Sequence, residues 1–412
     1  MNLLLLNHYA GTPALGMEYR PYYLAREWVR LGHRVQIIAA NFSHVRTRQP
    51  RAGAQTVDGI EYIWLPTPAY AGNGLGRMRN IMAYLRQAWT LADDLVRQFK
   101  PDGVIASSTY PMDIWVARRI TQAARAAGGR ACLVYEVHDL WPLSPIELSG
   151  MSPWHPFALI CQSAEDAAYR HSDAVISMLP KVHQHMASRG LALKKLSIVP
   201  NGISPEEWGD HTEPLRADVA QALAEARQSA AVVVGYAGSM GLPNALDRLL
   251  DAASLLRDAP LHIVMVGDGH ERARLARRLE VEGLTRVTLL PPIPKAQVPA
   301  FLEGVDVAYI GWQRVPIYRF GIAPNKLMDY MMAGKPVLHA VEAGNDPVGD
   351  ARCGLTVSPD DPRAIADGLR QLAALTPRQR RSLGERGRAY VLRHHSYPVL
   401  AQQFLRAVEA AP

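Results

Sequence analysis

A lysine and an aspartate lie three positions apart in a segment whose ends carry the signals of a short helix. Lys326 and Asp329 fall between Pro324, which suits the first turn of a helix, and Gly334, which suits its end. The helix dipole disfavours a cation in the first turn, so we expect Lys326 to meet an anion such as pyrophosphate. Asp329, one turn later on the same surface, would accept hydrogen bonds from ribose hydroxyls. A solvent-exposed ion pair worth less than about 1 kcal/mol also fits this spacing.

Two glycine-containing turns precede this segment, and both could hold phosphate. The first contains Gly238, Ser239 and Gly241; it follows the apolar run 232–236 and leads into a helical pattern. Glycines let the backbone approach a phosphate closely, and the helix N-terminus supplies free N–H groups. The second turn, around Gly267, follows the next apolar run. Tight strand-to-helix turns without a ligand have the same pattern, so the glycines alone leave both interpretations open.

The composition indicates a globular protein of two domains. The 412 residues carry a formal net charge of +7, with 48% hydrophobic and 20% charged residues. A modest basic excess favours anionic partners such as phosphate-bearing substrates or an anionic membrane surface. Nucleic acid is not expected as a partner, because the basic residues are dispersed and no helix-turn-helix, zinc-knuckle or aromatic–basic signature occurs.

Neither the cysteines nor the apolar segments indicate export. Cys132, Cys161 and Cys353 are widely spaced, which favours buried thiols over a disulfide framework or a zinc site. The leucines at positions 3–6 lack the preceding basic residue of a secretory signal and suit a first buried strand. No stretch approaches the roughly 18 apolar residues of a membrane span. We therefore expect a cytoplasmic protein that at most touches the inner face of the membrane.

The elements that would position these residues are short apolar runs alternating with helical segments. Most runs are continuous rather than alternating, as in parallel strands buried on both faces, so the chain predicts doubly wound α/β sheets. In the first half the runs are Leu3–Leu6, Val35–Ala40, Ile60–Leu65, Val104–Ala106, Leu133–Val137, Ala174–Met178 and Leu196–Val199. In the second half they are Val232–Tyr236, His262–Val266, Val287–Leu290, Val305–Ile310, Pro336–Ala340 and Gly354–Val357.

A proline- and glycine-rich break from Pro200 to about Pro214 separates the two halves. We place a Rossmann-like domain in residues 1–205 and a second one in residues 206–385. Residues 386–412 read as a helix that packs back toward the first domain. Ligands of open parallel sheets bind beyond the carboxyl ends of the strands, so two facing domains predict a central cleft that holds the site.

The run Pro-Asn-Lys-Leu-Met-Asp-Tyr-Met-Met-Ala-Gly-Lys-Pro-Val of residues 324–337 closely resembles the donor-site helix of glycosyltransferase family 4. Weaker likenesses occur in the order of that family at residues 31–33, 199–202, 236–238 and 266–269, so the resemblance spans nearly the whole chain. It implies the GT-B fold and a retaining, hexosyl-type glycosyltransferase. This run is most similar to the O-antigen and capsule branch, which includes fucosamine-transferase-type enzymes.

The resemblance also implies the residues of the donor site. They are Gly238, Ser239, Gly241, Arg319, Gly321, Ile322, Asn325, Lys326, Leu327 and Asp329, with Gly267 and Ile293 beside the base. The family has two acidic residues eight positions apart, and the first of these positions is Gly321, so one carboxylate is missing. Backbone N–H groups near Gly321 and Ile322 could replace it. The cations that relatives carry after the first glycine turn are also missing, which leaves phosphate to Lys326, helped by Arg319 or Arg314.

In the first domain, the end of one apolar run is a candidate catalytic region, and the resemblance implies an acceptor loop. His138 and Asp139 end an apolar run, where they could contact the transferred sugar or the acceptor hydroxyl, although a lone histidine is as often structural. Lys326 completes the catalytic set by neutralising the leaving diphosphate. The acceptor loop contains Gly11, Gly16, Glu18 and Arg20, of which the last two fit a solvated helix start equally well.

The resemblance implies the partners: a nucleotide-sugar donor, expected to be UDP-linked, and a polyprenyl-diphosphate-linked or oligosaccharide acceptor. Arginines 77, 79, 86, 118 and 119, with nearby Tyr and Trp residues, suggest a face for an anionic membrane. No metal cofactor is expected, because the chain contains no Asp-x-Asp pair to hold Mg²⁺ against a diphosphate.

We therefore expect transfer of a sugar, such as an N-acetylated amino sugar, in lipopolysaccharide, O-antigen or capsule synthesis. Two rivals share the architecture. One is a nucleotide-sugar 2-epimerase, for which no acidic and basic set is found. The other is a non-catalytic nucleotide-sugar-binding or scaffold paralogue, which the missing carboxylate at Gly321 favours.

Overall fold

The computed structural model describes residues 1–72, 74–209 and 213–411 and divides into two compact units. The first unit contains residues 1–201 together with the segment from Tyr397 onward, and the second contains Gly202–Ser396. The chain therefore leaves the first unit and later returns to it. The boundaries expected from the sequence were 205 and 385.

The first unit is built on an eight-stranded sheet of order β3-β4-β2-β1-β5-β6-β7-β8. All pairs are parallel except β3 with β4. The order reverses at β1, which pairs with β2 on one side and β5 on the other, so loops at this point can part to form a crevice. The strands are β1 Asn2–Leu6, β2 Arg34–Ala40, β3 Gly53–Val57, β4 Ile60–Leu65, β5 Gly103–Ala106, β6 Cys132–Val137, β7 Ala174–Ser177 and β8 Leu196–Ile198.

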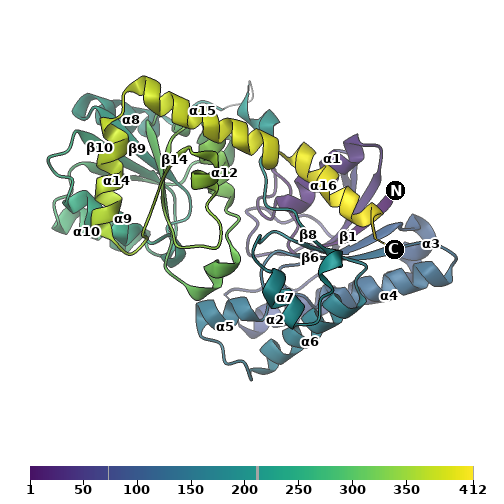
Figure 1. The fold of residues 1–412 in the computed structure, drawn as a ribbon. Helices are drawn as coiled ribbons and strands as arrows, with labels where there is room; N and C mark the ends of the chain where they lie inside the picture. Colours follow the sequence, from purple (N-terminus) through teal and green to yellow (C-terminus); the bar gives the residue numbers. More distant parts are fainter. Residues whose placement is uncertain (73, 210–212, 412) are drawn as a thin grey trace. The chain divides into compact units, whose positions relative to one another are not determined.

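Helices cover both faces of this sheet (Figure 1). On one face the last helix packs on α1: Trp28 donates from Nε1 to the carbonyl of Ala401 at 3.2 Å, and its ring meets Phe404 edge-on at 5.0 Å. The helices are α1 Arg20–Arg30, α2 Leu75–Thr90, α3 Ala92–Phe99, α4 Asp113–Ala126, α5 Leu143–Ser149, α6 Pro156–His171, α7 His183–Ser188 and α16 Tyr397–Glu409. The aromatic rings of α1 and α16 thus share one core with strands β1, β2 and β4.

The second unit has a six-stranded, fully parallel sheet of order β11-β10-β9-β12-β13-β14. Its order reverses at β9, the strand that leads into the first glycine turn. The strands are β9 Val232–Ala237, β10 Leu261–Val266, β11 Val287–Leu290, β12 Val307–Gly311, β13 Val337–Ala340 and β14 Gly354–Val357. The helices are α8 Ala217–Ser229, α9 Leu246–Ser254, α10 Arg272–Val281, α11 Val298–Glu303, α12 Asn325–Met332, α13 Pro347–Ala351, α14 Pro362–Ala374 and α15 Pro377–His394.

Two apolar cores hold the second unit, one on each face of its sheet. On one face α12 is anchored from behind by α15, which approaches so closely that a β-carbon on Gly384 would lie 1.7 Å from the carbonyl oxygen of Gly334. Glycine is therefore required at position 384. The buried face of α12, with Leu327, Met328 and Met331, leaves its opposite face for polar residues.

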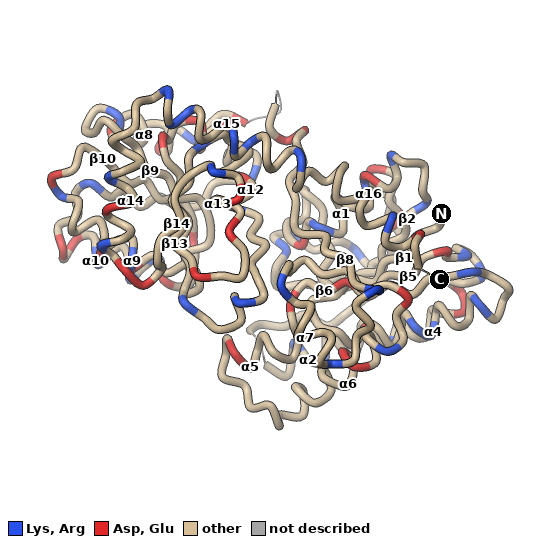
Figure 2. Tube along the Cα trace, viewed as in Figure 1, with Lys and Arg blue, Asp and Glu red and all other residues tan. Residues whose placement is uncertain are grey.

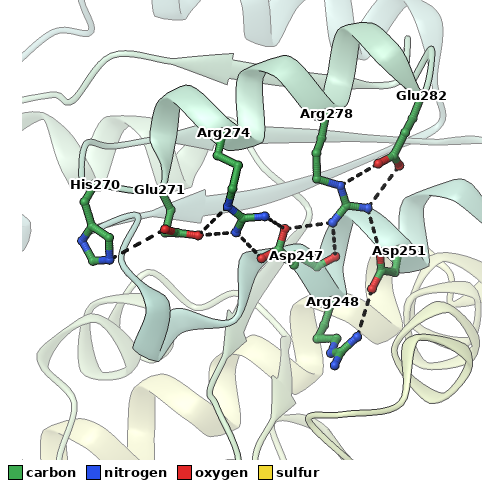
Figure 3. A network of polar contacts seen from close by, with 8 residues as sticks. All are labelled: Asp247, Arg248, Asp251, His270, Glu271, Arg274, Arg278 and Glu282. Carbon is green, nitrogen blue, oxygen red and sulfur yellow. Dashed lines mark hydrogen bonds and ion pairs between the residues drawn. The ribbon is translucent and has the colours of Figure 1, made fainter. Parts of the chain in front are cut away.

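On the other face, an ion-pair network ties α9 to α10 (Figure 3). Arg278 bonds to Asp247 at 2.8 Å, Asp251 at 2.7 Å and Glu282 at 2.6 Å, and Arg274 joins Asp247 to Glu271. This network orients α9, the helix that follows the first glycine turn. Elsewhere Lys and Arg are interspersed with Asp and Glu in both units (Figure 2).

These two parallel-sheet domains confirm the α/β fold class expected from the sequence. Most of the strands overlap the continuous apolar runs. The edge strand β3 was missed, because its sequence Gly-Ala-Gln-Thr-Val is largely exposed and polar and carries no apolar run.

Candidate functional site

Lys326 lies in the first turn of α12, and its ammonium is directed at the first glycine turn rather than at solvent. Nζ donates to the hydroxyl of Tyr236 at 3.1 Å and to Oδ1 of Asn244, and it lies 4.9 Å from the centre of the Tyr236 ring. Among the residues that the structure describes, no carboxylate pairs with Lys326. The protein therefore holds this cation with neutral oxygen atoms and an aromatic ring.

Burial without an anionic partner lowers the pKa of Lys326 to about 7. The free protein would thus carry this lysine in a mixture of charged and neutral forms near neutral pH. An anion bound beside it would favour the charged form. The sequence placed Lys326 against an anion, and the structure adds that nothing in its own described surroundings neutralises it.

The first glycine turn is shaped around the lysine. A β-carbon on Gly238 would lie 3.3 Å from Cε of Lys326, in a backbone conformation with φ of 154°. The N–H of Gly238 donates to Val266, whereas those of Ser239 and Gly241 meet no acceptor within the described residues. Two backbone donors without a partner among the described residues therefore lie in the turn after β9, and the Lys326 ammonium contacts the same turn; N–H groups and a cation of this kind are what a phosphate site uses.

Asp329 is half-buried one turn after Lys326, and its carboxylate has no hydrogen-bond partner in the described part of the chain. Burial raises its pKa to about 7, although Lys295 lowers it in part. Lys295 is itself paired with Glu207 at 2.9 Å. Asp329 therefore faces a different neighbourhood from Lys326 and is free to accept hydrogen bonds from hydroxyl groups.

The backbone around Gly321 does not offer the N–H groups that we expected to replace the missing carboxylate. The N–H of Gly321 donates to the carbonyl of Tyr318 at 2.9 Å. The side chain of Asn345 accepts from the N–H of Ile322 at 2.7 Å and donates to its carbonyl at 3.0 Å. This corrects the expectation, because both N–H groups are already used inside the protein.

The remaining donor-site residues differ in what they can reach. Arg319 is exposed with its guanidinium 4.2 Å from the centre of the Phe320 ring, while Arg314 is paired with Glu342. Asn325 is exposed at the start of α12. The side chain of Leu327 is fully buried, so only its backbone could meet a ligand.

The second glycine turn lies against the first. A β-carbon on Gly267 would lie 1.9 Å from the carbonyl oxygen of Gly238, and its N–H donates to Leu290 at 3.3 Å. Gly267 is thus required for contact between two turns, whether or not a base binds there. Ile293 is half-buried after β11, the strand beside β10, so it lies at the same edge of the sheet.

In the first unit, His138 follows β6 and is only 5% exposed. Its Nε2 lies 3.0 Å from Oγ of Ser107 and 3.4 Å from Oε2 of Glu136. Burial by itself lowers the pKa of His138, but Glu136 and then Glu18 outweigh it, so the pKa is raised above its usual value. Burial likewise opposes the charge of Glu136, yet Arg20 and His138 hold its pKa at about 2.

Arg20 is a structural residue, which corrects its assignment to the acceptor loop. Arg20 is 2% exposed, and its guanidinium pairs with Glu136 at 2.8 Å. It also donates to the carbonyls of Val199 at 2.8 Å and Pro200 at 2.5 Å. These contacts fasten α1 and β6 to the end of the first unit and leave the side chain inaccessible to an acceptor.

The other loop residues are arranged as follows. Gly11 and Gly16 are buried, and a β-carbon on Gly11 would lie 2.1 Å from the carbonyl oxygen of Gly16. Both glycines therefore shape the loop by close backbone contact. Glu18 is half-buried, and burial raises the pKa of its carboxyl group against the effect of His138 and Arg20.

Asp139 is exposed and lines a cavity of about 710 Å³ between α2 and α5. The cavity wall is mostly apolar, with Met78 and Ile81 on α2, Leu148 on α5, and Trp141 between them. Leu75 and Leu148 at this cavity are 79% and 52% exposed. Large apolar side chains therefore face solvent directly beside the candidate catalytic pair.

Sequence reasoning missed four residues of these two clusters: Tyr236, Asn244, Ser107 and Glu136. Asn244 lies in the segment after the first glycine turn, where relatives carry cations. Only the fold shows that Lys326 of α12 contacts it. Glu136 lies on β6 and precedes His138, the residue directly after the strand, by two positions, so a strand period of two was the available signal.

Sequence models of two glycosyltransferase domains match the chain. Residues 16–202 match "Glycosyl transferase 4-like domain", and residues 231–374 match "Glycosyl transferases group 1". The chain is a glycosyltransferase of the GT-B type. The first match covers the unit that contains His138, and the second covers the unit that contains Lys326. The fucosamine-transferase-type branch is a finer assignment than these matches support.

This glycosyltransferase is 23% identical over 289 residues to WcaI of Escherichia coli (strain K12), a glycosyl transferase named for colanic acid biosynthesis. The match covers 68% of each chain. In fold it is similar to sucrose-phosphate synthase (tll1590) from Thermosynechococcus elongatus, with a TM-score of 0.74 and 18% identity. It is also similar to Alr3699/HepE from Anabaena in complex with UDP and glucose, with a TM-score of 0.66 and 16% identity. Both structural matches cover the whole of each chain.

None of the helices in residues 1–72, 74–209 and 213–411 has the length and apolar character needed to cross a membrane. Within the same ranges, no group of three or more His, Cys, Asp or Glu residues is arranged to hold a metal ion. Its three cysteines are buried free thiols.

Proposed function

We propose that this glycosyltransferase moves a sugar from a nucleotide-diphosphate donor to an acceptor in surface-polysaccharide synthesis, with retention of anomeric configuration. The observation that carries the proposal is the ammonium of Lys326, half-buried beside free backbone N–H groups and unpaired with any described carboxylate. A diphosphate fits this arrangement because it supplies the missing negative charge. Retention is part of the proposal because of the resemblance to family 4.

The chemical role of Lys326 follows from where charge develops. As the bond between the sugar and the diphosphate breaks, the leaving phosphate gains negative charge. A preorganised ammonium and two N–H donors stabilise that charge more than they stabilise the intact donor. Ser239 and Gly241 would supply the N–H groups, and Asn325 would contribute the start of α12.

For the donor we propose a uridine nucleotide carrying an N-acetylated amino sugar or a related hexose. The ribose would bind Asp329, whose carboxylate has no hydrogen-bond partner among the described residues, and the base would lie between Gly267 and Ile293. The similarity in fold to Alr3699/HepE, whose complex contains UDP and glucose, supports the choice of uridine. Arg319, which is exposed near α12, would cover the phosphates.

For the acceptor we propose a saccharide linked to polyprenyl diphosphate, presented at an anionic membrane surface. The apolar cavity between α2 and α5 supports this, because it is large enough for part of an isoprenoid chain and extends to Asp139. Arg77 lines the same cavity and could meet the diphosphate. WcaI, the relative named for colanic acid biosynthesis, supports a polysaccharide as the product.

The experiment that tests the donor is a thermal-shift screen with UDP, GDP and dTDP, followed by assays of sugar release and transfer. A ligand that binds only the folded state raises the melting temperature, and we expect the largest rise with UDP. Lys326→Ala should lose most of this rise while unfolding cooperatively. A full nucleotide response in that variant would remove the basis of the proposal.

A non-catalytic nucleotide-sugar-binding protein is the second candidate. It is favoured by the glycine at position 321 and by the internally bonded N–H groups there, which leave the sugar with fewer contacts. The two candidates separate in the same assay. The scaffold would bind UDP-sugars and neither hydrolyse nor transfer them.

A further inference from the structure

Only one ring nitrogen of His138 contacts other described side chains. Nε2 points inward, 3.0 Å from Oγ of Ser107 and 3.4 Å from Oε2 of Glu136. Nδ1 has no hydrogen-bond partner among the residues that the structure describes, and it is not sealed from solvent. The ring therefore anchors one nitrogen in the protein and presents the other outward.

The hydrogen bonds around Ser107 decide which nitrogen carries the proton. Arg20 pairs with Glu136 at 2.8 Å, so the carboxylate is ionised and can only accept hydrogen bonds. The Ser107 hydroxyl has one hydrogen and donates it to Oε2 of Glu136 at 2.6 Å. Ser107 Oγ can then offer only a lone pair to His138. Both oxygen atoms near Nε2 are acceptors, so Nε2 must carry a hydrogen.

We propose that Ser107 and Glu136 are positioning residues that hold His138 as the tautomer protonated on Nε2, so that Nδ1 accepts a hydrogen bond from a sugar hydroxyl. The contact with a sugar rests on the proposed function, whereas the tautomer does not. An acceptor atom in a fixed direction selects hydroxyl groups over ethers and carbonyls, which lack a hydrogen to donate. His138 would thus orient a sugar rather than simply fill space at the end of β6.

Charged groups around the ring determine when this lone pair exists. The titratable or charged residues that interact with His138 come from several elements: Glu18, Arg20, Asp113, Glu136 and Asp139. Glu136 and Glu18 favour the imidazolium, while burial and Arg20 oppose it. Nδ1 loses its lone pair when the ring is protonated. The hydrogen bond to a sugar should therefore strengthen as pH rises through the pKa of His138.

Nuclear magnetic resonance of the full chain, labelled with ¹⁵N at its 14 histidines, tests the tautomer directly. The resonances of His138 are identified as those that disappear in His138→Gln. Above the pKa of this residue, we expect a hydrogen on Nε2 and an unprotonated Nδ1. A neutral ring with its hydrogen on Nδ1 would overturn the proposal, and so would a ring that stays doubly protonated over the whole pH range in which the protein is folded.

Variants separate positioning from simple packing. In Ser107→Ala we expect the Nδ1–H tautomer to appear beside the Nε2–H form, and Ser107→Thr, which keeps a hydroxyl, should restore the single tautomer. Ser108→Ala is the matched control, because Ser108 accepts from the backbone N–H of His8 and not from His138. An unchanged His138 spectrum in Ser107→Ala would contradict the role of Ser107. Glu136→Gln should lower the pKa of His138, and an unshifted titration would contradict the role of Glu136.

Kinetics then test the contact with a sugar. Ser107→Ala should lower kcat by about tenfold, with KM for the nucleotide sugar little changed because the nucleotide is assigned to the second unit. A wild-type kcat in a variant with mixed tautomers would contradict the proposed sugar contact but not the assignment of the tautomer. If the wild-type protein transferred no sugar, the proposed function itself would be refuted, so the two failures are distinguishable.

Discussion

The ammonium of Lys326 lies 3.1 Å from the hydroxyl of Tyr236, although the two residues are 90 positions apart in the chain. The strand that precedes the first glycine turn thus contacts the helix that carries the lysine. Tyr236 in turn donates its hydroxyl hydrogen to the carbonyl of Ser239. One tyrosine therefore couples the direction of the cation to the shape of the turn.

Replacing Lys326 by alanine should lower the rate of sugar transfer by roughly 10²–10³-fold, because the leaving diphosphate loses its cation. The fold should persist, since no described ion pair depends on this lysine. Steady-state kinetics with a UDP-sugar measure the rate, and circular dichroism checks the fold. The matched control is Lys335→Ala, which removes a lysine that donates to the carbonyl of Glu303 and should leave transfer near the wild-type rate. Equal losses in the two variants would argue against a specific role for Lys326.

The residue at position 244 should affect the affinity of Lys326 for a phosphate group. Asn244→Asp places a carboxylate beside the ammonium, which would raise the pKa of Lys326 and compete with the diphosphate. We expect nucleotide affinity to fall by about tenfold, because an internal partner now satisfies the cation. Asn244→Ala should have a smaller effect, since it removes an orienting contact and adds no competing charge. Isothermal titration calorimetry with UDP measures both, and tighter binding by Asn244→Asp would be inconsistent with this geometry.

Binding of a diphosphate should take up a proton above neutral pH. Burial lowers the pKa of Lys326 to about 7, so at pH 8 the free protein carries this lysine mainly as the neutral amine. A bound diphosphate raises that pKa, and the lysine then becomes charged. Affinity should therefore weaken as pH rises above 7. Calorimetry of UDP binding at pH 8 in buffers of different ionisation enthalpy reports the protons taken up. The same titration with Lys326→Ala should lose most of the uptake.

Arg20→Ala should destabilise the first unit strongly. The variant leaves Glu136 buried without its cation, and breaking a buried pair costs about 3–5 kcal/mol. Arg34→Ala breaks a more exposed pair with Glu61, whose side chains are 48% and 30% exposed, and should cost no more than about 1 kcal/mol. Urea unfolding of the full chain compares the two. Similar losses would show that burial of the Arg20 pair contributes little.

The sheets could be predicted from the sequence because their strands are continuous apolar runs, and the lysine helix because its segment begins with proline and ends with glycine. The contacts of Lys326 could not be predicted, because Tyr236 and Asn244 come close to it only in the folded unit, where the order of the strands places β9 near α12. Gly321 illustrates a different limit. Its position predicted free N–H groups, yet Asn345, 24 residues later, takes the N–H of the neighbouring Ile322. Likewise, the sequence allowed Arg20 to be a solvated residue at a helix start, whereas the structure pairs it with Glu136 on β6.

The return of α16 to the first unit has a consequence for biosynthesis of the protein. Trp28, Tyr23 and their neighbours on α1 are covered by residues 397–409, so a ribosome that has translated only the first 201 residues has made a unit with an open apolar face. That face stays uncovered while the next 195 residues of the second unit are translated. Nascent chains of this enzyme should therefore depend on chaperones that shield apolar surface, and a stop codon shortly before residue 397 should yield aggregates rather than a stable first unit.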